Sequence, residues 1–260
     1  MVIMDFLVIC VVAMAASLLT LFSGFGLGTL LMPVVALFFP IEVAITITAI
    51  VHFANNGFKA FLVGKDAVFS VIVKFGIPAI IFAILGAFLL TTMSSSDALV
   101  NYQFLSYQFT STVMKIVVGC LILLLVVIEL LPYFKSLAIH KKYLPFGGAL
   151  SGFLGGLSGH QGAFRSMFLL KAGLTKEQFV ATGVILAILV DISRLTIYGW
   201  YFGTTQTGIN WWLVLSACLS AFLGAYFGKK LLTKITINTV QNCVSVLLVL
   251  IGIGLVLGIV

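Results

Sequence analysis

The hydrophobic positions of this chain form long uninterrupted runs, and the short segments between them hold most of the polar residues. Runs such as IVVGCLILLLVVIELL lack the apolar–polar alternation of a membrane β-barrel, so they indicate helices. A helix needs about 20 apolar residues to cross a bilayer. The pattern predicts apolar helical segments at 3–22, 26–39, 42–63, 68–92, 110–131, 146–158, 160–171, 177–200, 210–228 and 237–259.

Short segments adjoin the two glycine-rich parts of the chain. At a rise of about 1.5 Å per residue, three segments are too short to cross a bilayer alone, namely 26–39, 146–158 and 160–171. Each adjoins a break, either SGFGLG at 23–28 or GGLSGHQG at 155–162. We expect hairpins of half-length helices that turn inside the protein, where irregular backbone is shielded from lipid.

A ladder of glycines precedes the second break at a spacing of four residues, at Gly148, Gly152 and Gly156. Glycines on one face of a membrane helix let a neighbouring backbone approach closely. The ladder therefore predicts tight packing of the half-length helix 146–158 against another helix.

Lysines in the loops predict the orientation of the chain. They gather in four loops, at Lys65, at Lys135 with Lys141 and Lys142, at Lys171 with Lys176, and at Lys229 with Lys230 and Lys234. The segments 93–109 and 201–209 contain no lysine or arginine. Because positive loops stay in the cytoplasm, the four loops are predicted to be cytoplasmic and the other two external. Both termini are then external.

The two halves of the chain resemble each other. A shift of 135 residues overlays 39–59 on 174–194 and aligns Gly24 with Gly159, Glu42 with Glu177, Asn56 with Asp191, and Lys59 with Arg194. The aligned segments run in opposite directions across the membrane. We therefore predict an all-α polytopic membrane protein of two inverted-topology repeats, each a re-entrant hairpin followed by three transmembrane helices. The repeats are 1–131 and 146–260, joined by a cytoplasmic linker at 132–145 into one integral membrane domain.

Composition supports membrane insertion. The chain is 62% hydrophobic and 8% charged, with a mean hydropathy of +1.27, whereas soluble domains contain about 25% charged residues. The net charge of +7 comes from scattered cations that act as orientation signals, so no nucleic-acid partner is expected. The N-terminus lacks a basic region and a small-residue cleavage site, and it is interpreted as a first membrane segment.

The second break contains a candidate anion site. Inverted repeats with broken helices bind substrate near the membrane midplane, and the positive ends of half-helices favour an anion. A buried arginine is costly in a membrane unless it has a partner, and a bound oxyanion would be one. The candidate substrate-binding residues here are Ser158, Gly159, His160, Gln161 and Arg165. For Arg165 the alternative is a structural role, either capping backbone carbonyls or pairing internally with Asp191.

The first half supplies the other wall of this candidate site. Gly24 and Gly26 belong to the first break. The segment 42–63 places polar residues three, four and seven positions apart on one helical face, at His52, Asn55, Asn56 and Lys59. His52 is near the centre of its segment, whereas Lys59 lies near the cytoplasmic end, where it either gates the path or snorkels to the surface.

Asp191 and Arg194 are three residues apart and are expected to pair, either as a structural salt bridge or as part of a gate. A proton is an open candidate for the coupling ion, through His52, His160 or Asp191. No catalytic motif or metal-ligand cluster is present in the sequence, and His52, His140 and His160 lie far apart. Neither an enzyme activity nor a cofactor is predicted.

The sequences GFGLGTLLMP and GLSGHQGAFRS, together with the duplicated layout, resemble the sulfite exporter TauE/SafE family of membrane permeases. The resemblance covers nearly the whole chain. It implies transport, usually export, of small sulfur-containing anions such as sulfite or sulfoacetate, across a bacterial or archaeal cell membrane. Many members carry a glycine- and proline-rich second break, whereas this chain has His160, Gln161 and Arg165 there.

Two alternatives remain open from the sequence. One is a permease for a cation or a neutral solute, in which Asp191 and the amides coordinate substrate. The other is a membrane scaffold that transports nothing, although the chain has no long loops to recruit partners.

Overall fold

The structure is a computed structural model that describes residues 3–23, 26–94, 98–104, 107–130, 139–202, 209–231 and 237–259. Its helices are α1 (Ile3–Ser23), α2 (Leu27–Ala36), α3 (Ile41–Val63), α4 (Phe69–Ser94), α5 (Val113–Leu130), α7 (Leu144–Ser158), α8 (Gly162–Leu169), α9 (Lys176–Phe202), α10 (Trp211–Leu231) and α11 (Ile237–Val256). Two short 3₁₀ helices, η1 (Gly64–Asp66) and η2 (Lys141–Tyr143), and two strands, β1 (Ala98–Phe104) and β2 (Tyr107–Thr112), complete the described elements. The chain is therefore mostly helical, as predicted.

Prolines and glycines account for several helix ends. Pro40 immediately precedes α3, and Pro145 lies in the first turn of α7, where its missing N–H has no intrahelical partner to lose. Gly159 ends α7 in the left-handed conformation, at φ 82°. Glycine adopts this conformation without steric cost, so the second break falls where the sequence predicts it.

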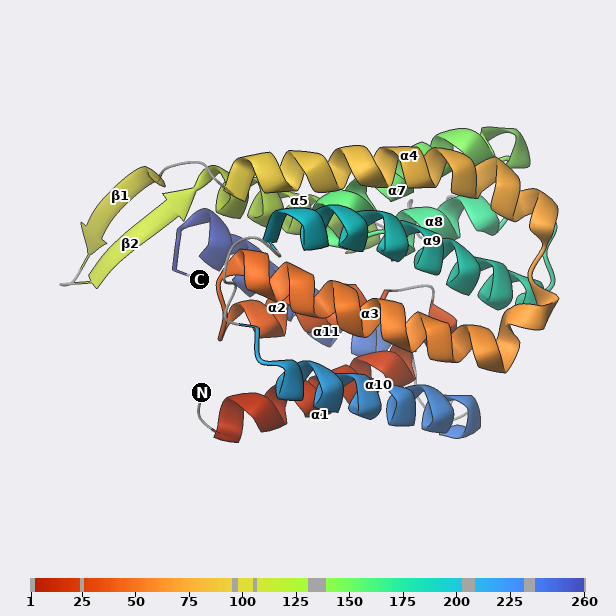
Figure 1. Ribbon diagram of the computed structural model, residues 1–260, viewed down its shortest axis with the longest axis horizontal. Coiled ribbons are helices and arrows are strands. Elements are labelled where there is room, and N and C mark those ends of the chain that lie inside the picture. Colours follow the sequence, from red (N-terminus) through yellow and green to blue (C-terminus); the bar gives the residue numbers. More distant parts are fainter. Residues whose placement is uncertain are drawn as a thin grey trace.

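The helices pack in a reciprocal arrangement. Helix α1 lies along α10 at one side of the bundle, and α7 lies along α4 at the other (Figure 1). Helices α3 and α9 run next to each other between these two pairs. Each half of the chain thus contributes one helix to each outer pair and one helix to the centre.

Glycines allow the two helices of each outer pair, α7 with α4 and α10 with α1, to pack with their backbones close together. A Cβ atom added at Gly148, Gly152 or Gly156 of α7 would collide with a backbone carbonyl of α4. A Cβ at Gly224 of α10 would collide in the same way with the Met14 carbonyl of α1. The glycine ladder is therefore a helix-packing surface, as the sequence predicts.

Replacing Gly152 by alanine is expected to lower the stability of the protein by about 1–3 kcal/mol, because the added methyl group meets the Ala79 backbone and forces α7 away from α4. Thermal unfolding in detergent measures this effect. Gly199→Ala is the matched control, since a Cβ at Gly199 of α9 meets nothing within 4 Å. Equal unfolding temperatures for the two variants would contradict the assigned packing.

Within the described residues, four helices are long and apolar enough to cross a membrane, over Ile41–Asp66, Phe69–Ser94, Lys176–Tyr201 and Trp211–Gly228. They correspond to four of the predicted crossings. The other two predicted crossings form α5 and α11, whose described apolar stretches, Val113–Ile128 and Ser245–Val256, are shorter. Large apolar side chains such as Phe61, Trp200 and Trp212 point outward and are mostly exposed, as expected for a surface in contact with lipid.

The expectation of an all-α fold is wrong in one respect. Residues 98–104 pair in antiparallel fashion with 107–112, and helix α5 begins at Val113 rather than at 110. The stretches ALVNYQF and YQFTST alternate apolar or aromatic residues with polar ones, which favours strands. The hairpin projects from one end of the bundle (Figure 1), and the Tyr102 hydroxyl donates to the Leu257 carbonyl at 2.6 Å.

Candidate functional site

The two glycine-rich breaks meet inside the bundle. Helix α2 begins after Gly26, and a Cβ added at Gly28 would lie 3.4 Å from the carbonyl oxygen of Gly159. A Cβ at Gly26 would lie 3.5 Å from Nε2 of His52. The backbone of the first break therefore approaches both the second break and the centre of α3. Gly24 lies outside the described residues.

The second break is longer than the sequence suggests. We expected a half-helix to start directly after Gly159, but α8 starts at Gly162, and Gln161 precedes it as the N-cap residue. Residues 159–161 therefore form a connection that is neither helix nor strand. Arg165 then lies within the first turn of α8.

The polar face of α3 is buried, as the spacing of its residues predicts. His52, Asn55, Asn56 and Lys59 are all buried, whereas Phe61 on the opposite side is exposed. Lys59 does not snorkel, since only 4% of its surface is exposed. With its amide nitrogen donating to Ser17 and to the Ala221 carbonyl, Asn55 turns its oxygen toward the Lys59 ammonium at 3.2 Å.

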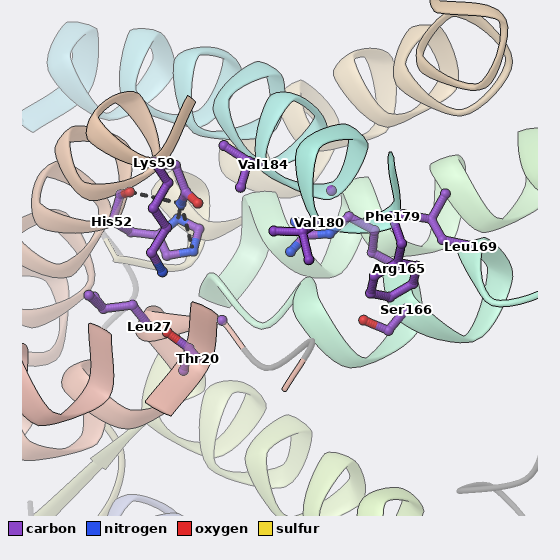
Figure 2. Close-up of a pocket in the computed structure, with 13 residues that line it drawn as sticks. Thr20, Leu27, His52, Lys59, Arg165, Ser166, Leu169, Phe179, Val180 and Val184 are labelled. Carbon is purple, nitrogen blue, oxygen red and sulfur yellow. Dashed lines mark hydrogen bonds between the residues drawn. The ribbon is translucent and has the colours of Figure 1, made fainter. Parts of the chain in front are cut away.

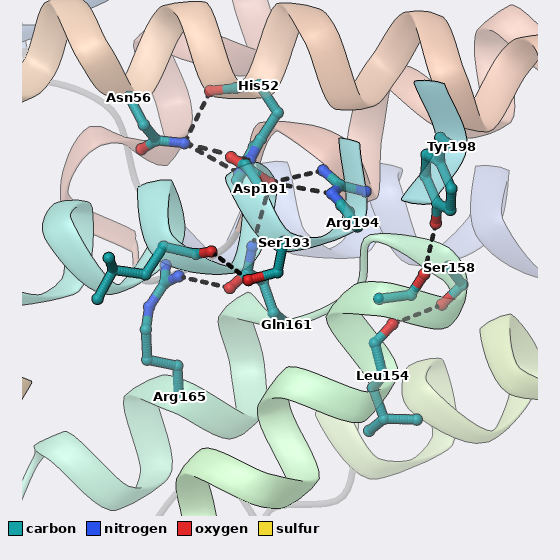
Figure 3. Close-up of polar contacts among 12 residues, drawn as sticks. His52, Asn56, Leu154, Ser158, Gln161, Arg165, Asp191, Ser193, Arg194 and Tyr198 are labelled. Atoms are coloured by element: carbon teal, nitrogen blue, oxygen red, sulfur yellow. Dashed lines mark hydrogen bonds and ion pairs between the residues drawn. The ribbon is translucent and has the colours of Figure 1, made fainter. Parts of the chain in front are cut away.

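Asp191 is the centre of a buried polar network (Figure 3). Its Oδ1 accepts hydrogen bonds from Nε and Nη2 of Arg194 at 3.0 and 2.8 Å. Its Oδ2 accepts from Nδ1 of His52 at 2.6 Å. The amide nitrogen of Gln161 lies 3.5 Å from Oδ1. The salt bridge expected from the i, i+3 spacing is therefore present, and it also links α9 to α3 and to the second break.

Arg165 is separated from this network by one side chain. Its Nη1 donates to the amide oxygen of Gln161 at 3.3 Å, so Gln161 lies between Arg165 and Asp191 (Figure 3). The alternative of a direct Arg165–Asp191 pair is thus wrong. Arg165 is 8% exposed, and the amide oxygen of Gln161 is the hydrogen-bond acceptor of its guanidinium among the described residues.

Ser158 and His160 face each other rather than Arg165. The hydroxyl of Ser158 donates to the Leu154 carbonyl, and Nδ1 of His160 lies 3.1 Å from that hydroxyl. His160 Nε2 is buried and has no hydrogen-bond partner among the described residues. On the same side of the break, the Tyr198 hydroxyl donates to the Gly156 carbonyl.

A pocket lies beside the Asp191 network and encloses about 510 Å³ of empty space, its mouth included (Figure 2). Its walls come from α1, α2, α3, α8 and α9, through Thr20, Gly26, Leu27, His52, Asn56, Lys59, Arg165, Ser166, Leu169, Phe179, Val180, Gly183 and Val184. Among the described residues of this lining, Lys59 and Arg165 are the cations and none is a carboxylate. The hydroxyl of Thr20 is buried and has no partner among the described residues.

The structure therefore divides the predicted site residues into three groups. The pocket lining includes Gly26, His52, Asn56, Lys59 and Arg165. Gln161, Asp191 and Arg194 form the network behind it. The remaining described ones, Ser158, Gly159, His160 and Asn55, are buried but do not line the pocket.

Sequence reasoning missed one wall of the pocket. The beginning of α9 contributes Phe179, Val180, Gly183 and Val184, and α1 contributes Thr20. These residues carry no charge and follow no motif, so only their position in the fold reveals their role. The overlay of 39–59 on 174–194 is the one signal that pairs this helix with α3.

A bundle of long apolar helices around a buried polar pocket is the architecture of an integral membrane protein. A family model, Sulfite exporter TauE/SafE, matches residues 9–255 of the chain. The chain therefore belongs to the TauE/SafE family, whose members are membrane transporters and not enzymes. No curated protein and no solved structure gives a significant match.

Proposed function

We propose that this protein is a secondary transporter that exports small sulfur-containing anions, such as sulfite or organosulfonates. The observation that carries the proposal is the charge of the pocket, whose described lining contains Lys59 and Arg165 and no carboxylate. Guanidinium and ammonium groups form strong charge-assisted hydrogen bonds with oxyanions. Family membership supports the same class of substrate.

Uncharged donors strengthen the case for an oxyanion. Gly26 and Leu27 line the pocket at the start of α2, where free N–H groups and the positive end of the helix dipole favour an anion. The Thr20 hydroxyl has no partner among the described residues, so it can donate to a ligand oxygen. From α8 the lining contains Arg165, Ser166 and Leu169, so this helix contributes a side face rather than its N-terminus.

Export through this pocket requires alternating access, and the reciprocal packing supports a mechanism based on inverted repeats. Helices α1–α5 and α7–α11 follow the same order of long and short elements. Helix α1 packs on α10, while its counterpart α7 packs on α4, the counterpart of α10. We propose that the repeats 1–131 and 146–260, linked by 132–145, move against each other during transport.

The pocket extends toward the side that the lysine distribution assigns to the cytoplasm. Thr20 and Lys59 lie near the ends of α1 and α3, and Phe179 lies near the start of α9. On the other side of His52, the Asp191 network and the Tyr198–Gly156 hydrogen bond occupy the space between the helices. An export cycle would begin from such a cytoplasm-facing pocket.

His52 is the best candidate for coupling to a proton. It lines the pocket, and its Nδ1 hydrogen-bonds to Asp191. A proton gained at Nε2, which is close to Gly26, would add a positive charge and a donor where the anion binds. Lys59, Arg165, Arg194 and Asp191 are the charged groups around it.

The alternative of a cation permease is less well supported. Its cation would be coordinated by Asp191, but both oxygens of that carboxylate already accept hydrogen bonds from Arg194 and His52. A flux assay with the purified protein in liposomes separates the remaining possibilities. A transporter for anions would move sulfite or a sulfonate, a cation permease would show the opposite charge preference, and a scaffold would move no solute.

Sulfite, sulfate, thiosulfate and sulfoacetate are expected to stabilise the purified protein against heat in a dose-dependent way, because a ligand that binds only the folded state shifts unfolding by mass action. At a concentration of 100 times Kd the stabilisation is about 2.7 kcal/mol. Acetate, an anion without sulfur, at equal ionic strength is the control. No stabilisation by any sulfur oxyanion or sulfonate would contradict the proposed function.

A further inference from the structure

Two cations from different elements share the pocket. Lys59 comes from α3 in the first half of the chain, and Arg165 comes from α8 in the second half. Both side chains are buried, at 4% and 8% exposed (Figure 2). The two side chains, one from each half of the chain, therefore line the same pocket.

Neither Lys59 nor Arg165 forms an ion pair with a described acidic residue. The ion pairs within the described part of the chain join Asp191 to Arg194 and to His52. When the Asn55 amide is oriented so that its nitrogen faces acceptors, its oxygen accepts from the Lys59 ammonium at 3.2 Å. Arg165 donates to the amide oxygen of Gln161 at 3.3 Å. Both partners are neutral, so they orient the cations without cancelling their charge.

Two like charges around one small cavity repel each other, and burial in a low dielectric strengthens this repulsion. A ligand with one negative charge can neutralise only one of them. A ligand with two negative charges removes both the repulsion and the cost of burying the second cation. Two cations in the lining therefore favour a ligand with two negative charges over a ligand with one.

We propose that the pocket prefers doubly charged anions and that Lys59 is the residue that determines this preference. This inference rests on the proposed anion transport through the same pocket. Arg165 holds one anionic group, and Lys59 holds the second negative charge, which is either on the same oxyanion or on a carboxylate at the other end of a short sulfonate. Lys59 is thus a specificity residue, and neither a surface anchor nor a gate.

Pairs of ligands that differ in charge but share a sulfonate group test this inference. Sulfoacetate, with two negative charges, and methanesulfonate, with one, are compared by thermal stabilisation and by competition in a binding assay at constant ionic strength. The wild-type protein is expected to bind sulfoacetate at least about tenfold more tightly, the effect of one additional charge-assisted contact. This comparison needs no variant.

Lys59→Gln is expected to weaken sulfoacetate binding by about tenfold or more and to leave methanesulfonate binding within about twofold. Lys59→Arg keeps the positive charge and should keep the preference for the dianion. Lys65→Gln is the matched control, because Lys65 is exposed and lies near the same end of the bundle but does not line the pocket. It is expected to change neither affinity.

The possible outcomes separate this inference from the proposed function. Equal affinity of the wild type for the two sulfonates, or an equal loss of both in Lys59→Gln, would overturn the role of Lys59 and leave anion binding intact. Binding of neither sulfonate, nor of sulfite, would overturn the proposed function itself.

Discussion

Arg165→Gln is expected to reduce the affinity for sulfite and for sulfonates by about ten- to a hundredfold, because it removes a buried charge-assisted donor from the pocket. Glutamine is nearly as long as the arginine stem and keeps a polar end, so it can still meet Gln161 across the same contact. Export from loaded liposomes should fall with affinity when the anion concentration is below the wild-type Kd.

Two companion variants make this result specific. Arg165→Lys keeps the charge but loses the planar, bidentate geometry, so an intermediate affinity is expected. Lys171→Gln removes an exposed cation a few residues further along the chain and should have no effect. An unchanged affinity in Arg165→Gln, with the protein still folded, would move the anion site away from this pocket.

Asp191→Asn is expected to destabilise the protein by about 3–5 kcal/mol, the typical cost of removing one partner from a buried ion pair. The substitution leaves the Arg194 guanidinium buried without its counter-ion and weakens the hydrogen bond from His52. Because Asp191 joins α9 to α3 and to the second break, the loss should appear as a lower unfolding temperature of the whole bundle. Thermal unfolding in detergent measures it.

A double variant tests the origin of this cost. Asp191→Asn combined with Arg194→Gln removes both charges, so it should be more stable than the sum of the two single variants predicts. A coupling free energy near zero would mean that the ion pair contributes little to the fold.

Much of the fold could be predicted because it depends on local patterns. The ends of most helices follow from apolar runs bounded by glycine and proline, as at Pro40 and Gly159. The β-hairpin was missed, although the alternation in ALVNYQF indicates a strand. A strand of this kind forms only when it pairs with a second strand. Here 98–104 pairs with 107–112, and the pattern within either segment alone does not specify this pairing.

The candidate site could be predicted only in part. The common face of His52, Asn56 and Lys59 follows from the helical period, and its burial follows from the cost of polar groups in lipid. The sequence also indicates Arg165 as a costly buried cation. It contains no signal for the apolar wall at the start of α9, because such residues are common in every membrane helix.

The sequence by itself determined the membrane setting, the positions of the helices, the two glycine-rich breaks and the Asp191–Arg194 pair, since each depends on residues that are close together in the chain. Only the tertiary structure decided which charges are neutralised. His52 reaches Asp191 across 139 positions of the chain, Gln161 stands between Asp191 and Arg165, and Lys59 shares a pocket with Arg165. Electrostatic partners depend on distance in space, and that distance is set by the packing of α3, α8 and α9 around the breaks.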